Sequence, residues 1–137
     1  MKNYAVDPQK LRVFEEQLFE KVNVPKKDAK TIAELLVHAD LRNVRSHGVI
    51  RTVPYIEKIQ GGGASLTSTY PIVKETANSA VIDAQGGLGA IASEKAVALA
   101  RKKAQDNLIS IVTVRNSNHF GMVSAYSFHQ TNPDKSA

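Results

Sequence analysis

The chain has 137 residues, of which 42% are hydrophobic and 23% charged, and this balance indicates one soluble folded domain with a hydrophobic core. It has no cysteine, which excludes disulfides and thiolate chemistry, and its net charge of +5 comes from scattered lysines, without the basic, aromatic-rich run that is typical of nucleic-acid binding. No apolar run approaches the roughly 18 residues of a membrane span, and the N-terminus lacks the apolar centre of a signal peptide, so we expect a cytoplasmic protein without a membrane partner.

Two amphipathic helices are predicted at the start of the chain. Asp7 and Pro8 form a cap followed by a first-turn proline, and the apolar residues after them recur at helical spacing, which predicts a helix over 8–22. Pro25 opens a second helix, which is expected to reach about Arg42.

A third helical stretch is predicted from Ser46, a natural N-cap, to the glycines at 61–63. Pro54 lies inside it and must break or kink it, because proline lacks the N–H that an interior position donates. The residues expected to face inward are Val49, Val53, Ile56 and Ile59.

The hydrophobic pattern then changes to that of strands. Residues 72–76 and 80–83 read as two paired strands. The GGLG segment at 86–89 leads into a helix over about 90–105, and the short β-branched run at 109–114 predicts a buried strand. We therefore expect an α/β (α+β) fold, in which an N-terminal helical layer is followed by a small mixed sheet with one crossover helix.

The segment RNVRSHGVIRTVPY holds a candidate proton-transfer site. The pKa of a histidine lies near working pH, so His47 is a candidate general acid/base. Arg51 follows four residues later, hence on the same face if the helix is continuous, and its planar fork matches a carboxylate. Arg51 could instead form a structural salt bridge with Glu57 or Asp40, and Ser46 could act as a helix cap alone.

A second histidine, His119, lies in the segment RNSNHFG, which follows the last predicted strand. Ligands of open sheets gather beyond the C-terminal ends of strands, so His119 is a candidate for ligand binding. The alternative is a loop histidine that hydrogen-bonds to the backbone. The other two histidines, His38 and His129, fall in helical stretches and are interpreted as structural, and no metal site is expected.

The glycine-rich segment at 86–89 precedes a helix, which suggests a phosphate-binding loop. It matches neither GxGxxG nor GxxxxGK[ST], and no acidic residue follows at the distance that a dinucleotide site requires. We therefore interpret it as a strand-to-helix turn.

Three motifs, in this order, resemble the type-II malate/L-lactate dehydrogenase family: SHGVIRTVPY at 46–55, GGLG at 86–89 and VRNSNHFG at 114–121. The resemblance runs from about Leu11 to about Tyr126. It implies NAD or NADP as cofactor, a fold other than the ordinary Rossmann fold, and hydride transfer between the cofactor and a small 2-hydroxy or 2-oxo acid. The residues at hand distinguish neither NAD from NADP nor a malate, lactate or ureidoglycolate type of substrate.

The resemblance also implies roles for single residues. The residue that matches His47 moves a proton to and from the substrate oxygen, and the one that matches Ser46 relays or orients this proton. The position of Arg51 matches the group that binds the substrate carboxylate. The residues matched to the cofactor site are His119, Phe120, Gly121, Met122 and Val123. His119 is also a candidate for a second proton-transfer role.

Family members are much longer, so the chain looks like a truncated member: the N-terminal portion of the oxidoreductase. Residues 1–70 would be the helical part of the substrate domain, 71–130 a partial α/β region leading into the cofactor site, and 131–137 a frayed tail. The alternative is a catalytically inactive remnant that serves as an oligomerisation or interaction module. Apolar residues that lose neighbours, such as Ile111 and Phe120, are expected to favour a homodimer or a larger assembly.

Overall fold

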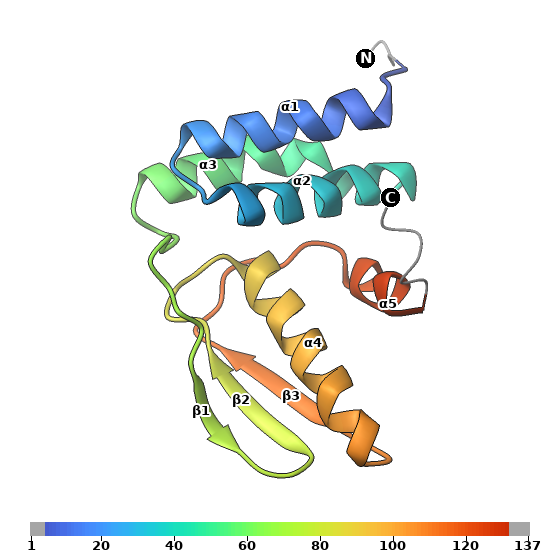
Figure 1. Ribbon diagram of the computed structural model, residues 1–137. Coiled ribbons are helices and arrows are strands. Elements are labelled where there is room, and N and C mark those ends of the chain that lie inside the picture. The colour runs from blue at the N-terminus through green and yellow to red at the C-terminus, as the bar shows by residue number, and fades with distance from the viewer. Residues whose placement is uncertain (1–4, 132–137) are drawn as a thin grey trace.

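The computed structural model describes residues 5–131, and side chains up to residue 127. A layer of helices lies beside a small three-stranded sheet, and one long helix covers one face of the sheet (Figure 1). The elements are α1 (Pro8–Lys21), α2 (Lys26–Leu41), α3 (Thr52–Gln60), β1 (Ile72–Glu75), β2 (Ser79–Asp83), α4 (Gly89–Asp106), β3 (Ile111–Arg115) and α5 (Val123–Thr131). The predicted α/β fold, a helical layer followed by a small mixed sheet with a crossover helix, is confirmed.

The first two helices begin as the sequence predicts. The carboxylate of Asp7 accepts the N–H of Lys10 at 2.9 Å, and Pro8 occupies the first helical position of α1. Pro25 is the N-cap residue of α2. This second helix is the most deeply buried, with seven buried residues along its length. It therefore forms the centre on which the other helices pack.

The third helix starts later than the sequence predicts. Residues 45–47 and 49–51 form two short 3₁₀ turns, η1 and η2, and α3 begins only at Thr52. Pro54 consequently lies in the first turn of α3, where no backbone N–H is needed, and the helix continues past it to Gln60 without a break. The prediction of an inward Val53 is also wrong, because this side chain is 62% exposed.

The sheet has the order β1-β2-β3, with an antiparallel β1–β2 pair and a parallel β2–β3 pair. Its crossover helix is α4, which joins the two parallel strands. The strand β3 lies at the edge of the sheet, and its residues alternate between exposed and half-buried. The prediction of a buried third strand is therefore wrong: α4 covers one face of the sheet, while Ile111 on the other face is 61% exposed.

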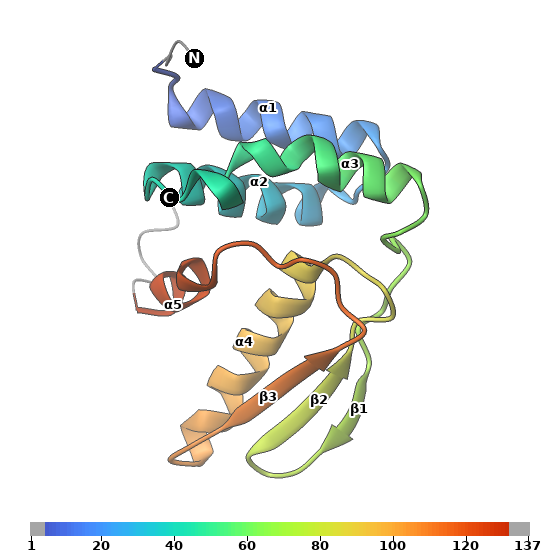
Figure 2. The ribbon, with the colours of Figure 1, turned by 180° about the vertical axis from the view of Figure 1, so that it is seen from behind.

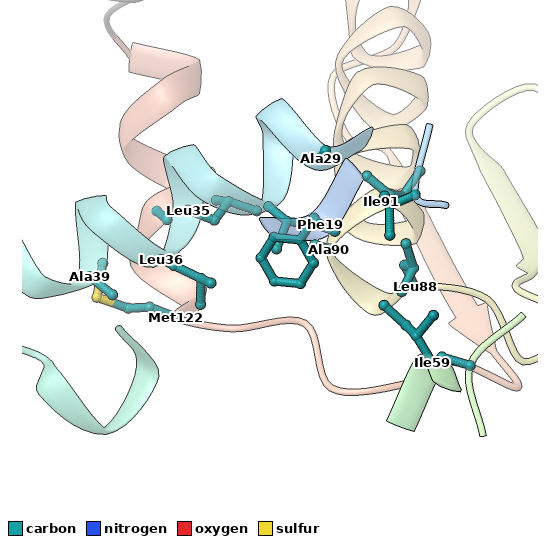
Figure 3. Close-up of a cluster of buried hydrophobic side chains, with 14 of the residues drawn as sticks. Phe19, Ala29, Leu35, Leu36, Ala39, Ile59, Leu88, Ala90, Ile91 and Met122 are labelled. Atoms are coloured by element: carbon teal, nitrogen blue, oxygen red, sulfur yellow. The ribbon is translucent and has the colours of Figure 1, made fainter. Parts of the chain in front are cut away.

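One hydrophobic core joins the helical layer to the α/β part. Its side chains come from α1 (Phe19), α2 (Leu36), α3 (Ile59), α4 (Ile91) and the segment before α5 (Met122), as Figure 3 shows. Because the same core reaches both parts of the chain, the loops between them are held in defined positions. The site described below is built from these loops.

The remaining predictions concern the two ends and the membrane. The predicted frayed tail at 131–137 lies, apart from Thr131, outside the described residues, and so does the side chain of His129. Within the described part of the chain, no helix has the length and apolar character to cross a membrane.

Candidate active site

His47 lies in a tight turn that α2 holds in place. After α2 ends, the chain reverses through Asn43, whose φ is 59°. Asp40, from the last turn of α2, then accepts the N–H of Val49 through Oδ2 at 2.8 Å. A Cβ atom at Gly48 would overlap this carboxylate, so only glycine lets the chain pass so close to Asp40. The SHG motif is thus a turn folded directly over a helical carboxylate.

Ser46 does not cap a helix, contrary to the prediction. It occupies the middle of η1, and neither η1, η2 nor α3 has a side-chain cap. Its hydroxyl lies 2.9 Å from Nδ1 of His47 instead. The serine is therefore in position to select which ring nitrogen of the imidazole carries the proton.

Arg51 lies next to this turn. The continuous helix that was expected to place Arg51 on the same face as His47 is replaced by the two 3₁₀ turns. Its Nε donates to the carbonyl oxygen of Ser46 at 2.7 Å, which leaves the two terminal nitrogens of the guanidinium as a fork. Within the described part of the chain, no carboxylate lies within ion-pair distance of Arg51, so the alternative of a salt bridge with Glu57 or Asp40 is not what the structure has.

His119 lies in the loop between β3 and α5, which passes between the helical layer and the sheet (Figure 2). The side-chain amide of Asn118 fastens this loop by donating to the carbonyl oxygens of Gly86 at 2.7 Å and Gly87 at 3.1 Å, with a longer contact of 3.3 Å to Gly63. A Cβ at Gly89 would overlap the carbonyl oxygens of Asn118 and His119. The GGLG segment therefore leaves room for the loop at Gly89 and provides carbonyl oxygens that accept hydrogen bonds from it. This agrees with the interpretation of the segment as a structural turn.

The two histidines meet although they are far apart in the sequence. The ring centroids of His47 and His119 are 5.4 Å apart, with an angle of 32° between the planes. The hydroxyl of Tyr55 lies 2.6 Å from Nδ1 of His119, and the backbone N–H of Gly121 donates to the same atom at 3.3 Å. A backbone N–H can only donate, so Nδ1 of His119 is an acceptor and the neutral ring carries its proton on Nε2.

The surroundings favour the neutral form of His119. Burial lowers the pKa of His119 below its ordinary value, and the positive charges of Arg51, His47 and Lys58 lower it further. Burial also raises the pKa of Tyr55, so this phenol keeps its proton and donates it to the imidazole. At neutral pH the pair is therefore an uncharged hydrogen-bonded unit beside two cationic side chains.

A small cavity of about 30 Å³ opens beside His119, between α2, α3 and the start of α4. The residues that line it are Ile32, Tyr55, Lys58, Ala64, Leu88, Gly89, Ala90, Asn118 and His119. Most of its wall is apolar, and its polar side chains come from α3 (Tyr55 and Lys58) and from the loop after β3 (Asn118 and His119). This volume is on the order of that needed by one or two water molecules, so the enclosed part of the cavity is much smaller than a typical small-molecule pocket.

The stretch after His119 has one buried and several accessible members. Phe120 is 41% exposed and Val123 65% exposed, and Gly121 has a φ of 86° with open space where a Cβ would stand. Met122, in contrast, is 7% exposed and points into the core next to Ala39 (Figure 3). A ligand on this stretch would meet the ring of Phe120 and the backbone of Gly121 rather than the side chain of Met122.

The sequence did not identify Lys58, Asn118 or Asp40 as site residues, and it placed Tyr55 in the histidine cluster without a role. The spacing could have predicted that Tyr55 belongs to the site, because Tyr55 follows Arg51 by four residues and side chains four apart share a helix face. Within the described part of the chain, no group of three His, Cys, Asp or Glu residues could hold a metal ion.

Comparison with known proteins agrees with the resemblance seen in the motifs. A family model described as malate/L-lactate dehydrogenase matches residues 6–133. The malate dehydrogenase of Pyrococcus horikoshii is 41% identical over 129 residues, which cover 89% of this chain and 36% of that protein. The L-sulfolactate dehydrogenase of Methanocaldococcus jannaschii is 40% identical over 117 residues, which cover 85% and 34%. The ureidoglycolate dehydrogenase (NAD(+)) of Escherichia coli K12 is 33% identical over 98 residues, 72% and 28%.

The fold agrees as well. The solved structure of the malate dehydrogenase from Pyrococcus horikoshii OT3 superposes with a TM-score of 0.88 at 39% identity, covering 93% of this chain and 38% of that one. The chain thus spans about a third of the length of the relatives that it matches.

Proposed function

The chain belongs to the malate/L-lactate dehydrogenase family, and we propose that it carries the proton-transfer and carboxylate-binding groups of an oxidoreductase that moves a hydride between NAD or NADP and a small 2-hydroxy or 2-oxo acid. The substrate would be of the malate, lactate or ureidoglycolate type, as in the names of the family and of the relatives. The observation that carries the proposal is the meeting of His47 and His119 at 5.4 Å, beside the open fork of Arg51.

His47 is the proposed general acid/base. When a 2-oxo acid is reduced, the carbonyl carbon receives the hydride and the carbonyl oxygen needs a proton, which an imidazolium can donate. In the oxidation, the neutral imidazole takes the proton of the hydroxyl group. Ser46 assists because its hydroxyl at 2.9 Å from Nδ1 orients the ring and fixes the proton on one nitrogen.

Arg51 is the proposed anchor for the substrate carboxylate. The bond from its Nε to the carbonyl oxygen of Ser46 orients the guanidinium next to the histidine turn. Its two terminal nitrogens are then directed as a pair, which matches the two oxygens of a carboxylate. The substrate's reacting oxygen would thereby be held near His47.

His119 is proposed to support the same reaction by hydrogen bonding. With Nδ1 occupied by Tyr55 and Gly121, its Nε2–H is a neutral donor that can stabilise negative charge on the substrate oxygen. The lowered pKa keeps it neutral near pH 7. We assign proton transfer to His47, and a hydrogen-bonding role to His119 with proton transfer as its alternative.

The segment from His119 to Val123 fits one side of a cofactor site. When bound, the nicotinamide supplies or accepts the hydride at the substrate carbon. The exposed ring of Phe120 lies 6.4 Å from the ring of His119 at 28°, and the open backbone at Gly121 leaves room for a flat ring. These two residues would hold the nicotinamide against the histidine pair.

The test introduces two substitutions, separately, into the form of the protein that reduces 2-oxo acids, whether this is the chain alone or an assembly. His47→Ala should lower kcat by at least about a hundredfold while cofactor binding survives, because one general acid/base contributes on that scale. Arg51→Lys should raise KM more than it lowers kcat, since lysine keeps the charge but loses the fork. Near-normal turnover of the His47→Ala form would show that His47 is not the general acid/base.

A second candidate function is a non-catalytic interaction module. The exposed edge strand β3 supports it: Ile111 is 61% exposed and Ile109, just before the strand, 69%. In that case no 2-hydroxy acid would bind at the histidine pair, while β3 would mediate association. Histidine NMR signals that do not respond to malate or lactate would favour the module.

A further inference from the structure

The two groups proposed to act on the substrate lie on one short segment without a long helix of its own. His47 belongs to η1 and Arg51 to η2, and each turn has three residues. The backbone N–H groups of His47, Gly48 and Arg51 donate to the carbonyl oxygens of residues 44, 45 and 48. These hydrogen bonds shape the turns internally, because both partners lie within the turns or directly beside them. The position of the segment relative to the rest of the fold therefore needs a contact from another element.

Asp40 of α2 provides this contact. Its Oδ2 accepts the N–H of Val49 at 2.8 Å, and its carboxylate also fills the space where a Cβ atom of Gly48 would stand. The carboxylate therefore touches the junction of η1 and η2 at two successive residues. Asp40 is itself well anchored, because it lies in the last turn of α2 next to Ala39, which is fully buried in the core. A hydrogen bond and a close contact from a packed helix thus hold the middle of the segment.

The proposed active groups are linked to one another inside the segment. Nε of Arg51 donates to the carbonyl oxygen of Ser46 at 2.7 Å, and the hydroxyl of Ser46 lies 2.9 Å from Nδ1 of His47. A displacement of the turns would consequently move the guanidinium and the imidazole together. His119 would not follow them, because it belongs to the loop after β3, which the amide of Asn118 fastens to the segment before α4.

We infer that Asp40 is a positioning residue of the proposed reaction, which keeps His47 and Arg51 in place by holding the junction of η1 and η2. This inference rests on the proposed function. Asp40 would not touch the substrate, and its effect would come from geometry. A misplacement of about 1 Å at a reacting group can cost about a hundredfold in rate, so loss of this contact should lower kcat far more than it changes cofactor binding.

The first measurement is the pKa of His119 in the 137-residue chain, obtained by NMR titration. The positive charges of Arg51 and His47 lower this pKa, so a variant that releases the turns should raise it. Asp40→Ala also removes a negative charge, and this loss alone would lower the pKa of a nearby imidazole. The direction of the change therefore separates lost positioning from lost charge, and we expect a rise.

Two variants and a control complete this measurement. Asp40→Asn keeps an oxygen that can accept the N–H of Val49, so it should not raise the pKa of His119. Gly48→Ala keeps every charge but forces a methyl group against the carboxylate, so it should raise this pKa. Glu34→Gln removes a carboxylate elsewhere on α2 and should leave the pKa unchanged.

Three results would overturn the positioning role of Asp40. The first is an unchanged or lowered pKa of His119 in folded Asp40→Ala, and the second is an equal rise in Asp40→Asn. If Asp40→Ala does not fold, Gly48→Ala decides the question, and an unchanged pKa in that variant is the third.

Turnover separates this inference from the proposed function. In the form of the protein that reduces 2-oxo acids, Asp40→Ala should lower kcat about a hundredfold and leave KM for the cofactor within about twofold, whereas Asp40→Asn should retain most of the activity. If His47→Ala lowers kcat and Asp40→Ala does not, the role of Asp40 is overturned while the proposed function stands. If His47→Ala has no effect, the proposed function itself fails, and the pKa of His119 still shows whether Asp40 holds the turns.

Discussion

The hydroxyl of Tyr55 lies 2.6 Å from Nδ1 of His119, although 64 positions separate the two residues in the chain. The bond ties α3 to the loop after β3, and thereby joins the helical layer to the α/β part at the candidate site. It also determines which nitrogen of the imidazole is free. The neutral ring then carries its proton on Nε2, the nitrogen that we propose donates to the substrate.

The first prediction concerns the pKa of His119. NMR titration should give a pKa below the ordinary value of 6.5, because burial and neighbouring cations disfavour the imidazolium. Arg51→Met should raise this pKa, since it removes one of these positive charges, and Lys21→Met is the matched control that should leave it unchanged. A wild-type value above 6.5 would contradict the environment described here.

The second prediction concerns the contact between Asp40 and Gly48. Gly48→Ala should lower the free energy of unfolding by about 1–3 kcal/mol, the usual cost of overpacking, because the new methyl group overlaps the carboxylate. Asp40→Ala removes the obstacle but leaves the N–H of Val49 without its acceptor. In a urea-unfolding double-mutant cycle, Gly48→Ala should therefore cost much less in the Asp40→Ala background. Additive losses would show that the two residues are not in contact.

The third prediction concerns Glu15, which is 4% exposed and accepts a 2.6 Å hydrogen bond from Thr52. Burial raises the pKa of Glu15 above its ordinary value of 4.5, and the charge of Asp40 adds to the rise. The folded state then binds this proton at a higher pH than the unfolded chain does. As the pH falls from 7 through the raised pKa, this carboxyl should therefore stabilise the fold, and the gain should be complete near pH 4.5.

Glu15→Gln tests this by removing the titration while keeping an acceptor for Thr52. The variant should be more stable than wild type at pH 7, and the difference should shrink as the pH is lowered to 5. Urea unfolding at several pH values measures it, with Glu20→Gln on the exposed side of α1 as control. If the stability difference between Glu15→Gln and wild type grew as the pH fell, the pKa of the buried Glu15 would not be raised.

The fourth prediction concerns association through β3. This strand lies at the edge of the sheet, with Ile111 61% exposed, and exposed edges with apolar side chains tend to pair with another chain. We expect light scattering to find a dimer or a larger species. Ile111→Lys should shift the distribution towards the monomer, because a charged side chain on an edge strand opposes pairing. A wild-type chain that is monodisperse and monomeric at high concentration would refute this expectation.

The sequence alone was sufficient to predict the helices α1, α2 and α4, the β1–β2 pair and the family. Capping residues and helical or alternating periodicity act over a few neighbouring positions, so Asp7, Pro8 and Pro25 mark the helix starts wherever the segment packs. The motifs likewise identified His47, Arg51 and His119 as candidates, because each short segment carries its residue types in a fixed order.

Only the tertiary structure decided how these residues are presented. The stretch at 46–51 forms 3₁₀ turns instead of a helix because Asp40, on another element, takes the N–H of Val49 and leaves no room for a side chain at Gly48. The strand β3 is exposed because no fourth strand or second helix layer covers it in the described part of the chain, although its composition is that of a buried strand. The meeting of His119 with Tyr55 depends on the carbonyl groups that hold Asn118, and contacts between residues so far apart leave no periodic signal in the sequence.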